Sequence, residues 1–99
     1  MLNINTQKDG DALNVALEGR LDTTTAPELE GKLKAELGDS KELNFDFSGL
    51  EYISSAGLRV LLASQKVMNK QGSMKIKNVN DTVKEIFDVT GFSDILTIE

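Results

Sequence analysis

The 99-residue sequence contains no cysteine and no histidine, and both absences narrow the chemistry open to the chain. Without cysteine there is no disulfide framework and no thiolate nucleophile. Without histidine there is no His-based catalytic triad, no imidazole general base, and none of the usual zinc sites. These absences exclude the commonest hydrolytic and metal-dependent mechanisms.

Long apolar runs and clustered basic residues are also missing. The most apolar run, residues 56–63, is interrupted by Arg59 and is too short to cross a membrane. The first ten residues lack the basic and apolar regions of a signal peptide. Sixteen acidic residues outnumber eleven scattered basic ones, which disfavours nucleic acid as a partner. We expect a cytoplasmic domain, monomeric when free, that contacts neither membrane nor nucleic acid directly.

The composition, with 39% hydrophobic and 27% charged residues, predicts one globular domain over residues 1–99. Apolar and polar residues alternate in short runs, which is typical of strands with one buried face. The expected strands are residues 2–5, 13–17, 43–48 and 74–77, with a last strand at 95–98. Apolar residues at helical spacing predict helices over 26–37, from the serines at 54 and 55 to about residue 70, and between Asn80 and Gly91.

Two of the expected helices carry recognisable start signals. Thr25 and Glu28 have the spacing of a capping box, and Pro27 falls in the first turn, where its missing N–H costs little. Asn80 is a suitable N-cap for the third helix, and Gly91 fits the position after its last turn.

The element order is therefore β-β-α-β-α-β-α-β, which predicts an α/β fold with an initial hairpin and mostly parallel pairing afterwards. Parallel strands covered on both faces usually read as continuous apolar runs, whereas these strands are apolar on one side only. We expect a single-layer sheet with its helices mainly on one face, unlike a doubly wound dinucleotide-binding fold.

The stretch from Asp46 to Arg59 is the strongest candidate for a functional site. It leaves a strand, crosses a short polar turn through Ser48, and enters a helix at Ser54 and Ser55. A serine there can be a simple N-cap, or it can hold an anion or a phosphate near the positive end of the helix dipole. Two hydroxyls stand where one cap suffices, and two small residues follow them, so both interpretations stay open.

A second polar corner precedes the first helix and consists of residues 22–25 (Asp-Thr-Thr-Thr). Because the ends of parallel strands meet at one edge of a sheet, both corners are expected at the carboxyl edge, where α/β domains usually bind ligands and partners.

Two segments resemble those of a known family. Asp46-Phe47-Ser48 followed by residues 52–59 (Tyr-Ile-Ser-Ser-Ala-Gly-Leu-Arg) resembles the signature of STAS domains, specifically of bacterial anti-sigma factor antagonists. The segment Gly19-Arg20-Leu21-Asp22, with Thr25-Ala26, resembles the other recurrent segment of that family. The resemblance covers nearly the whole chain and agrees with the order of elements.

The resemblance implies partner switching. The unmodified domain would bind an anti-sigma factor that is also a serine kinase, and a sigma factor would be released. Alignment on Gly57 places the phosphorylated position at Ser55, with Ser54 as the less favoured acceptor, standing where the family usually has Asp. A PP2C-type phosphatase would reverse the modification, and the chain itself would be no enzyme. The implied partner-binding residues are Asp22, Thr23, Thr24, Ser54, Ser55, Ala56, Gly57 and Arg59, with Asp46 and Ser48 supporting the motif.

Two alternatives belong to other classes. A STAS module of a transporter or signalling scaffold would use the same corner without phosphorylation. A small serine hydrolase would need a base for Ser55, and Phe47-Ser48-Gly49 does not match the Gly-x-Ser-x-Gly elbow. A phosphate-binding Gly-rich loop is likewise missing. We therefore expect no catalytic residue, no cofactor and no metal.

Overall fold

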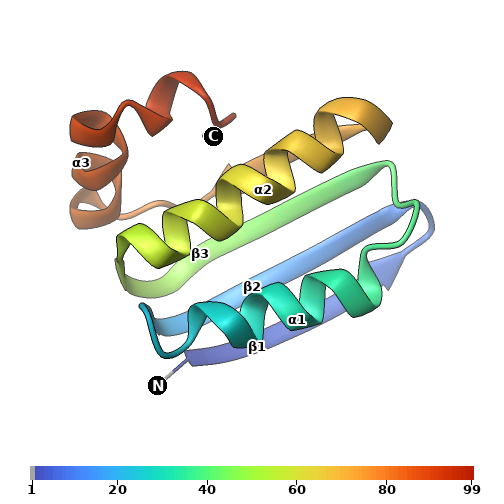
Figure 1. Ribbon diagram of the computed structural model, residues 1–99, viewed down its shortest axis with the longest axis horizontal. Helices are drawn as coiled ribbons and strands as arrows, with labels where there is room; N and C mark the ends of the chain where they lie inside the picture. Colours follow the sequence, from blue (N-terminus) through green and yellow to red (C-terminus); the bar gives the residue numbers. More distant parts are fainter. Residues whose placement is uncertain (1) are drawn as a thin grey trace.

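Four strands lie side by side in their order along the chain, in a computed structural model that describes residues 2–99 (Figure 1). β1 pairs antiparallel with β2, and β2, β3 and β4 run parallel to one another. This pairing confirms the expected hairpin followed by parallel strands. The elements are β1 (Leu2–Asp9), β2 (Ala12–Leu21), α1 (Ala26–Glu36), β3 (Glu42–Ile53), α2 (Ser55–Gln71), β4 (Ser73–Lys77), α3 (Asp81–Thr90) and the 3-10 helix η1 (Phe92–Asp94).

The sheet is covered on one face, as the alternation predicts. Figure 1 shows α1 and α2 side by side across the same face, with α3 beyond α2. The strand residues beneath them are fully buried: Leu13, Val15 and Leu17 from β2, and Leu43, Phe45 and Phe47 from β3. The intervening residues form a polar open face, on which the Asn44 side-chain amide donates a 3.1 Å hydrogen bond to Asn14. None of the helices in the described part of the chain is long and apolar enough to cross a membrane.

The aromatic core joins α3 to the sheet. The ring centroids of Phe45 and Phe47 are 5.7 Å apart, and those of Phe47 and Phe87 are 6.5 Å apart. Fully burying one such side chain contributes about 1.5–3 kcal/mol. The predicted cap of α3 is confirmed, because the Asn80 side chain accepts a 2.8 Å hydrogen bond from the N–H of Val83. The same side chain donates to the carbonyl of Leu50 in β3.

The predicted turn at Ser48 is wrong, because β3 continues to Ile53. Ala16 pairs with Asp46 and Leu21 pairs with Ile53, so β3 contains two more residues than the β2 segment opposite it, and the register shifts at two points. These irregularities replace strict alternation by a spacing of three residues. They keep Phe47, Leu50 and Ile53 on the buried face.

The predicted final strand at 95–98 is also wrong. Residues 92–94 form η1 instead, and both Ile95 and Leu96 donate backbone hydrogen bonds to the carbonyl of Phe92. Within residues 2–99, this segment pairs with the sheet only through an isolated parallel bridge between Ile98 and Ile76 in β4. Because these backbone groups bond locally, the chain joins the sheet only at its last described residues.

Candidate functional site

The two polar corners meet at one edge of the sheet. Leu21 and Ile53 are register partners at the ends of β2 and β3, and the N–H of Ser54 donates a 2.8 Å hydrogen bond to the carbonyl of Leu21. α1 begins five residues after Leu21, and α2 begins at the residue after Ser54. The structure therefore confirms that both corners lie at the carboxyl edge.

The loop between β2 and α1 is held by Asp22. Its Oδ1 atom accepts hydrogen bonds from the hydroxyl and the N–H of Thr24, at 2.7 and 3.0 Å, and from the N–H of Thr25 at 3.2 Å. The hydrogen bond from the Thr24 hydroxyl, aided by these backbone bonds, lowers the pKa of Asp22 below its usual range. Thr23 and Thr24 stay exposed on the outside of the loop.

The capping box predicted for Thr25 and Glu28 is wrong. The Thr25 hydroxyl donates to the carbonyl of Arg20 at 2.8 Å and accepts from the N–H of Asp22 at 2.9 Å. Its side chain makes no capping bond to α1. The Thr25 side chain is buried and its hydroxyl bonds within the loop, so it does not cap α1.

The two serines at the start of α2 differ in exposure. Ser54 is the N-cap residue by position, but its side chain makes no capping bond, and its Oγ atom is buried without a hydrogen-bond partner among the described residues. Of the two interpretations left open for these serines, capping of α2 by a serine side chain is therefore not what the structure has. Ser55 is the first residue of α2 and is exposed. Of the two hydroxyls, only that of Ser55 faces solvent.

The first turn of α2 packs against the strands through Gly57 and borders a hollow through Ala56 and Arg59. A Cβ atom on Gly57 would lie 2.7 Å from side-chain carbons of Leu21 and of Ile53, so Gly57 lets the helix approach both strands closely. The half-buried Ala56 and the exposed Arg59 line a hollow of about 190 Å³ between the starts of α1 and α2. The remaining residues of this hollow are Thr23, Ala26, Pro27, Glu30 and Val60.

Asp46 and Ser48 are not part of this surface. They belong to the polar positions of β3, on the face opposite Phe47. Asp46 accepts 3.0 Å hydrogen bonds from the Asn78 side chain and from the N–H of Ser48, and the Asn78 bond is the main cause of its lowered pKa. Asp46 and Lys77 line a hollow on the open face of the sheet. Asp46 and Ser48 therefore belong to the face of the sheet that the helices leave uncovered.

Sequence reasoning missed several neighbours of the corner. Pro27 and Glu30 of α1 lie across the hollow from Ala56 and Arg59 of α2. On each helix the two residues are three positions apart, a spacing that places them on the same face. This spacing was the signal in the sequence that could have identified them. The Arg20 guanidinium lies 4.5 Å from the ring centroid of Tyr52, a contact set by the strand register. That register depends on the irregular pairing, which alternation alone does not reveal.

The site offers an exposed hydroxyl with no hydrogen bond to a base within residues 2–99. The same residues contain no cluster of three or more acidic side chains that could hold a metal ion. The positive end of the α2 dipole favours a negative group at the Ser55 position. Fold and site together define a small α/β domain with a one-sided sheet and an exposed serine at the start of its second helix.

A family model described as "Mlab, STAS domain" matches residues 4–97, and the chain belongs to this family. The anti-sigma-B factor antagonist of Bacillus subtilis (strain 168) is 30% identical over 98 residues, which cover 98% of this chain and 90% of the relative.

Two solved structures share the fold. An anti-sigma factor antagonist from Mycobacterium paratuberculosis superposes with a TM-score of 0.89 at 22% identity, covering 99% of this chain and 85% of the other. The Bacillus cell fate determinant SpoIIAA in its phosphorylated form superposes with a TM-score of 0.76 at 16% identity, covering 98% and 91%. These comparisons confirm the predicted family and fold class.

Proposed function

We propose that this protein is an anti-sigma factor antagonist, which binds an anti-sigma factor with serine kinase activity and thereby releases a sigma factor. The name of the Bacillus subtilis relative, which matches nearly the whole chain, supports this function. The observation that carries the proposal is the exposure of Ser55 at the first residue of α2, beside a Ser54 hydroxyl that is buried. Anti-sigma factors with kinase activity and the sigma factors they release act in the cytoplasm, and we propose that this protein does too.

The partner-binding surface, as we propose it, consists of the exposed or half-exposed side chains around the hollow: Thr23, Thr24, Ser55, Ala56 and Arg59. Three other residues predicted to bind the partner instead hold this surface in place. Asp22 fixes the loop, Ser54 ties α2 to β2 through its N–H, and Gly57 allows the close approach of α2.

Phosphorylation of Ser55 is the proposed off-switch. The Ser55 oxygen would attack the γ-phosphorus of ATP bound to the kinase, the bond to the ADP oxygen would break, and the hydroxyl proton would be lost. A phosphate carries about −1.5 to −2 charges near neutral pH. At a helix N-terminus this charge is tolerated, but within an interface it repels acidic groups and must be desolvated. Each ~1.4 kcal/mol of such cost weakens binding tenfold.

Ser55 is favoured over Ser54 as the acceptor because a kinase needs the hydroxyl in its own active site. The Oγ atom of Ser54 is buried, so this side chain would have to turn outward before a kinase could reach it. A PP2C-type phosphatase would hydrolyse the exposed phosphoester and restore the binding form.

The test compares wild-type, Ser55→Asp and Ser73→Asp baits in lysate of the source organism, with bound proteins identified by mass spectrometry. Ser73 is exposed at the start of β4 and serves as the matched control for added charge. We expect wild type and Ser73→Asp to capture a kinase-type anti-sigma factor and Ser55→Asp to lose it. The purified pair should then show a dissociation constant at least tenfold larger for Ser55→Asp.

Equal capture of a transporter or scaffold protein by all three baits would contradict the switch. The domain would then be a STAS interaction module that works without phosphorylation.

A further inference from the structure

Arg59 is the basic residue nearest in the helix to the proposed phosphorylation site, one turn after Ser55. We propose that Arg59 binds the phosphate on Ser55 within the same molecule, and that this capture withdraws Arg59 from the partner-binding surface. The inference rests on the proposed function, because it concerns how the modification of Ser55 would act.

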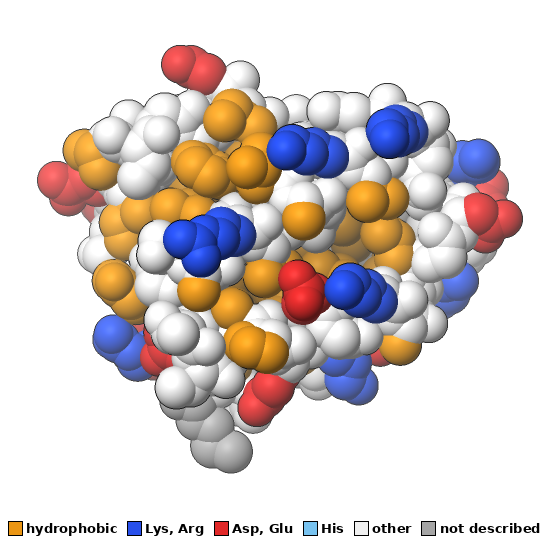
Figure 2. Space-filling model, viewed as in Figure 1, with side chains coloured by type: hydrophobic (Ala, Val, Ile, Leu, Met, Phe, Trp, Pro, Cys, Tyr) orange, Lys and Arg blue, Asp and Glu red, His pale blue; other side chains and the backbone are white. Residues whose placement is uncertain are grey.

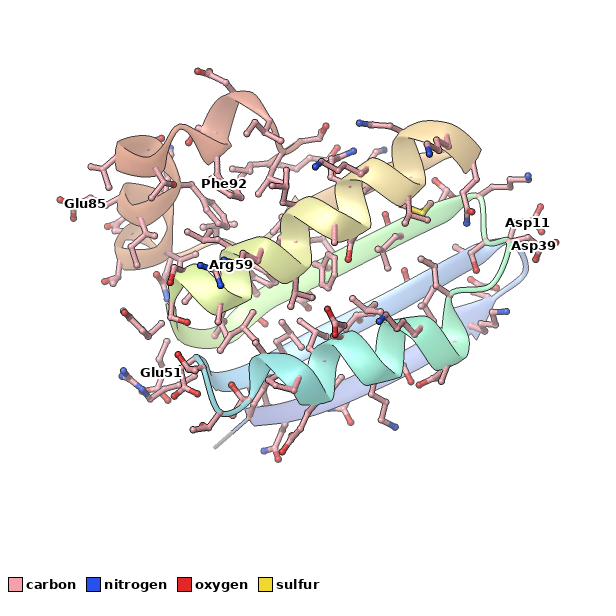
Figure 3. All side chains as sticks on the ribbon, in the orientation of Figure 1. Asp11, Asp39, Glu51, Arg59, Glu85 and Phe92 are labelled. Carbon is pink, nitrogen blue, oxygen red and sulfur yellow. The ribbon has the colours of Figure 1, made fainter. Side chains whose placement is uncertain are left out.

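Helix geometry brings the two side chains together. Residues i and i+4 of an α-helix are neighbours on its surface, and helical side chains lean toward the N-terminus. Ser55 and Arg59 have this spacing, and both are exposed. Figure 3 shows Arg59 at the start of α2, on the outer side of the helix. Its guanidinium can therefore reach back over the turn that begins at Ser55.

Arg59 is also free to accept this role. The ion pairs found within residues 2–99 join Lys32 to Glu36, Lys34 to Glu30, and Lys75 to Glu99, and none includes Arg59. Glu30 of α1 lines the same hollow, but its carboxylate lies 3.8 Å from Lys34 instead. In the neighbouring loop, Asp22 already accepts hydrogen bonds from Thr24 and Thr25.

A phosphate on Ser55 would be the strongest anion within reach of Arg59. Guanidinium and phosphate form short, charge-assisted hydrogen bonds, often two in parallel. The same group would face the free N–H groups of the first turn of α2. Figure 2 shows basic side chains lying amid apolar surface on the face that carries α2, and Figure 3 places Arg59 on this face. In the unmodified protein, an acidic group of a partner could pair with Arg59 there.

One modification would then act twice. It would add negative charge to the surface, and it would neutralise the cation that the partner uses. The partner would lose an attraction and gain a repulsion at adjacent positions. In a protein without Arg59, phosphoserine would produce only the repulsion.

The test installs phosphoserine at position 55 of the full chain by amber suppression, so it needs no kinase and no partner. Phosphorus NMR then follows the second ionisation of the phosphate in wild type, Arg59→Gln and Lys66→Gln. Lys66 is an exposed cation on the same helix and controls for the general loss of one charge. Because a nearby cation favours the dianion, we expect the phosphate pKa to be higher in Arg59→Gln than in wild type by roughly 0.5, and unchanged in Lys66→Gln.

Equal phosphate pKa values in wild type and Arg59→Gln would overturn the capture. A nitrogen-edited spectrum gives a second readout, in which the Arg59 side-chain N–H should shift on phosphorylation and a signal that does not move would contradict the contact. Failure here leaves the lysate experiment intact, and failure of partner capture leaves this measurement valid, so the two proposals fail separately.

Discussion

The N–H of Ser54, the residue before the exposed Ser55, donates a 2.8 Å hydrogen bond to the carbonyl oxygen of Leu21. The ends of β2 and β3 are thus tied together by backbone atoms. The position of Ser55 depends on this bond and on the packing of Gly57, not on its own side chain. Surface side chains at the corner can therefore be exchanged without disturbing the frame that presents them.

Ser55→Ala should unfold in urea with a free energy within about 0.5 kcal/mol of wild type, as exposed positions usually do. Ser55→Asp should match wild type or exceed it by about 0.3–1 kcal/mol, because a carboxylate at the helix N-terminus interacts well with the dipole. Chemical denaturation monitored by circular dichroism measures both. A loss above 2 kcal/mol in either variant would show that Ser55 supports the fold, and the capture experiment would lose its meaning.

Gly57→Ala should destabilise the domain by about 1–3 kcal/mol, the usual cost of overpacking a core. The new methyl would lie 2.7 Å from side-chain carbons of Leu21 and Ile53, and these fully buried side chains would have to shift. Urea denaturation gives the change in free energy of unfolding.

Gly31→Ala is the matched control, since Gly31 lies in α1 and a Cβ atom there would meet no atom of residues 2–99 within 4 Å. It should raise the stability by up to about 1 kcal/mol through helix propensity. Equal effects at both glycines would contradict the close approach of α2 to the sheet.

Ser54→Ala should leave the stability unchanged or raise it by up to about 1 kcal/mol, although replacing a serine N-cap usually costs about that much. The reason is that the Ser54 hydroxyl is buried without a hydrogen-bond partner among residues 2–99, so its removal relieves a desolvation cost. Thermal unfolding checks the sign.

Asn80→Ala provides the contrast, because that side chain both caps α3 and donates to Leu50. It should cost at least about 1 kcal/mol. A similar loss in Ser54→Ala would mean that the Ser54 hydroxyl does make a stabilising bond.

The pH dependence of stability should weaken in Asp22→Asn. Hydrogen bonds lower the folded-state pKa of Asp22 below its unfolded value of about 3.9. The group therefore stabilises the fold above that value, and this contribution is lost as the pH falls through the folded-state pKa. Wild type should lose more stability than Asp22→Asn between about pH 6 and pH 3.

Asp39→Asn is a suitable control, because Asp39 is exposed in the loop before β3 and its side chain makes no hydrogen bond to other residues in 2–99. Its acid profile should follow that of wild type. If Asp22→Asn follows wild type as well, the hydrogen bonds of Asp22 do not favour its charged form.

The sequence predicted the helices and the one-sided sheet because their signals are local. Leu13, Val15 and Leu17 alternate with polar residues, and Asn80 caps a helix whose apolar residues recur at helical spacing. The end of β3 was missed because two register shifts against β2 replace alternation by a spacing of three. Such shifts depend on a strand 30 residues away, and no local pattern of residues 48–53 reveals them.

The candidate site was predicted by position but not in its internal contacts. The sequence brought residues 22–25 and 54–59 to one edge, where the structure has them. It did not show that Ser54 turns inward, that Gly57 packs beneath the surface, or that Asp46 belongs to the open face. Each of these contacts depends on the direction in which a side chain points. A strand irregularity or the start of a helix reverses that direction within one residue.

The strand order of the sheet, β1-β2-β3-β4, is also the order of synthesis. Each strand that leaves the ribosome finds its neighbour already made, and the helix between two parallel strands is complete before the second strand arrives. Helix α3, the 3-10 helix η1 and the bridge from Ile98 back to Ile76 are added last. A nascent chain with this layout can assemble from its first hairpin outward, without exposing a finished sheet edge that waits for a distant segment.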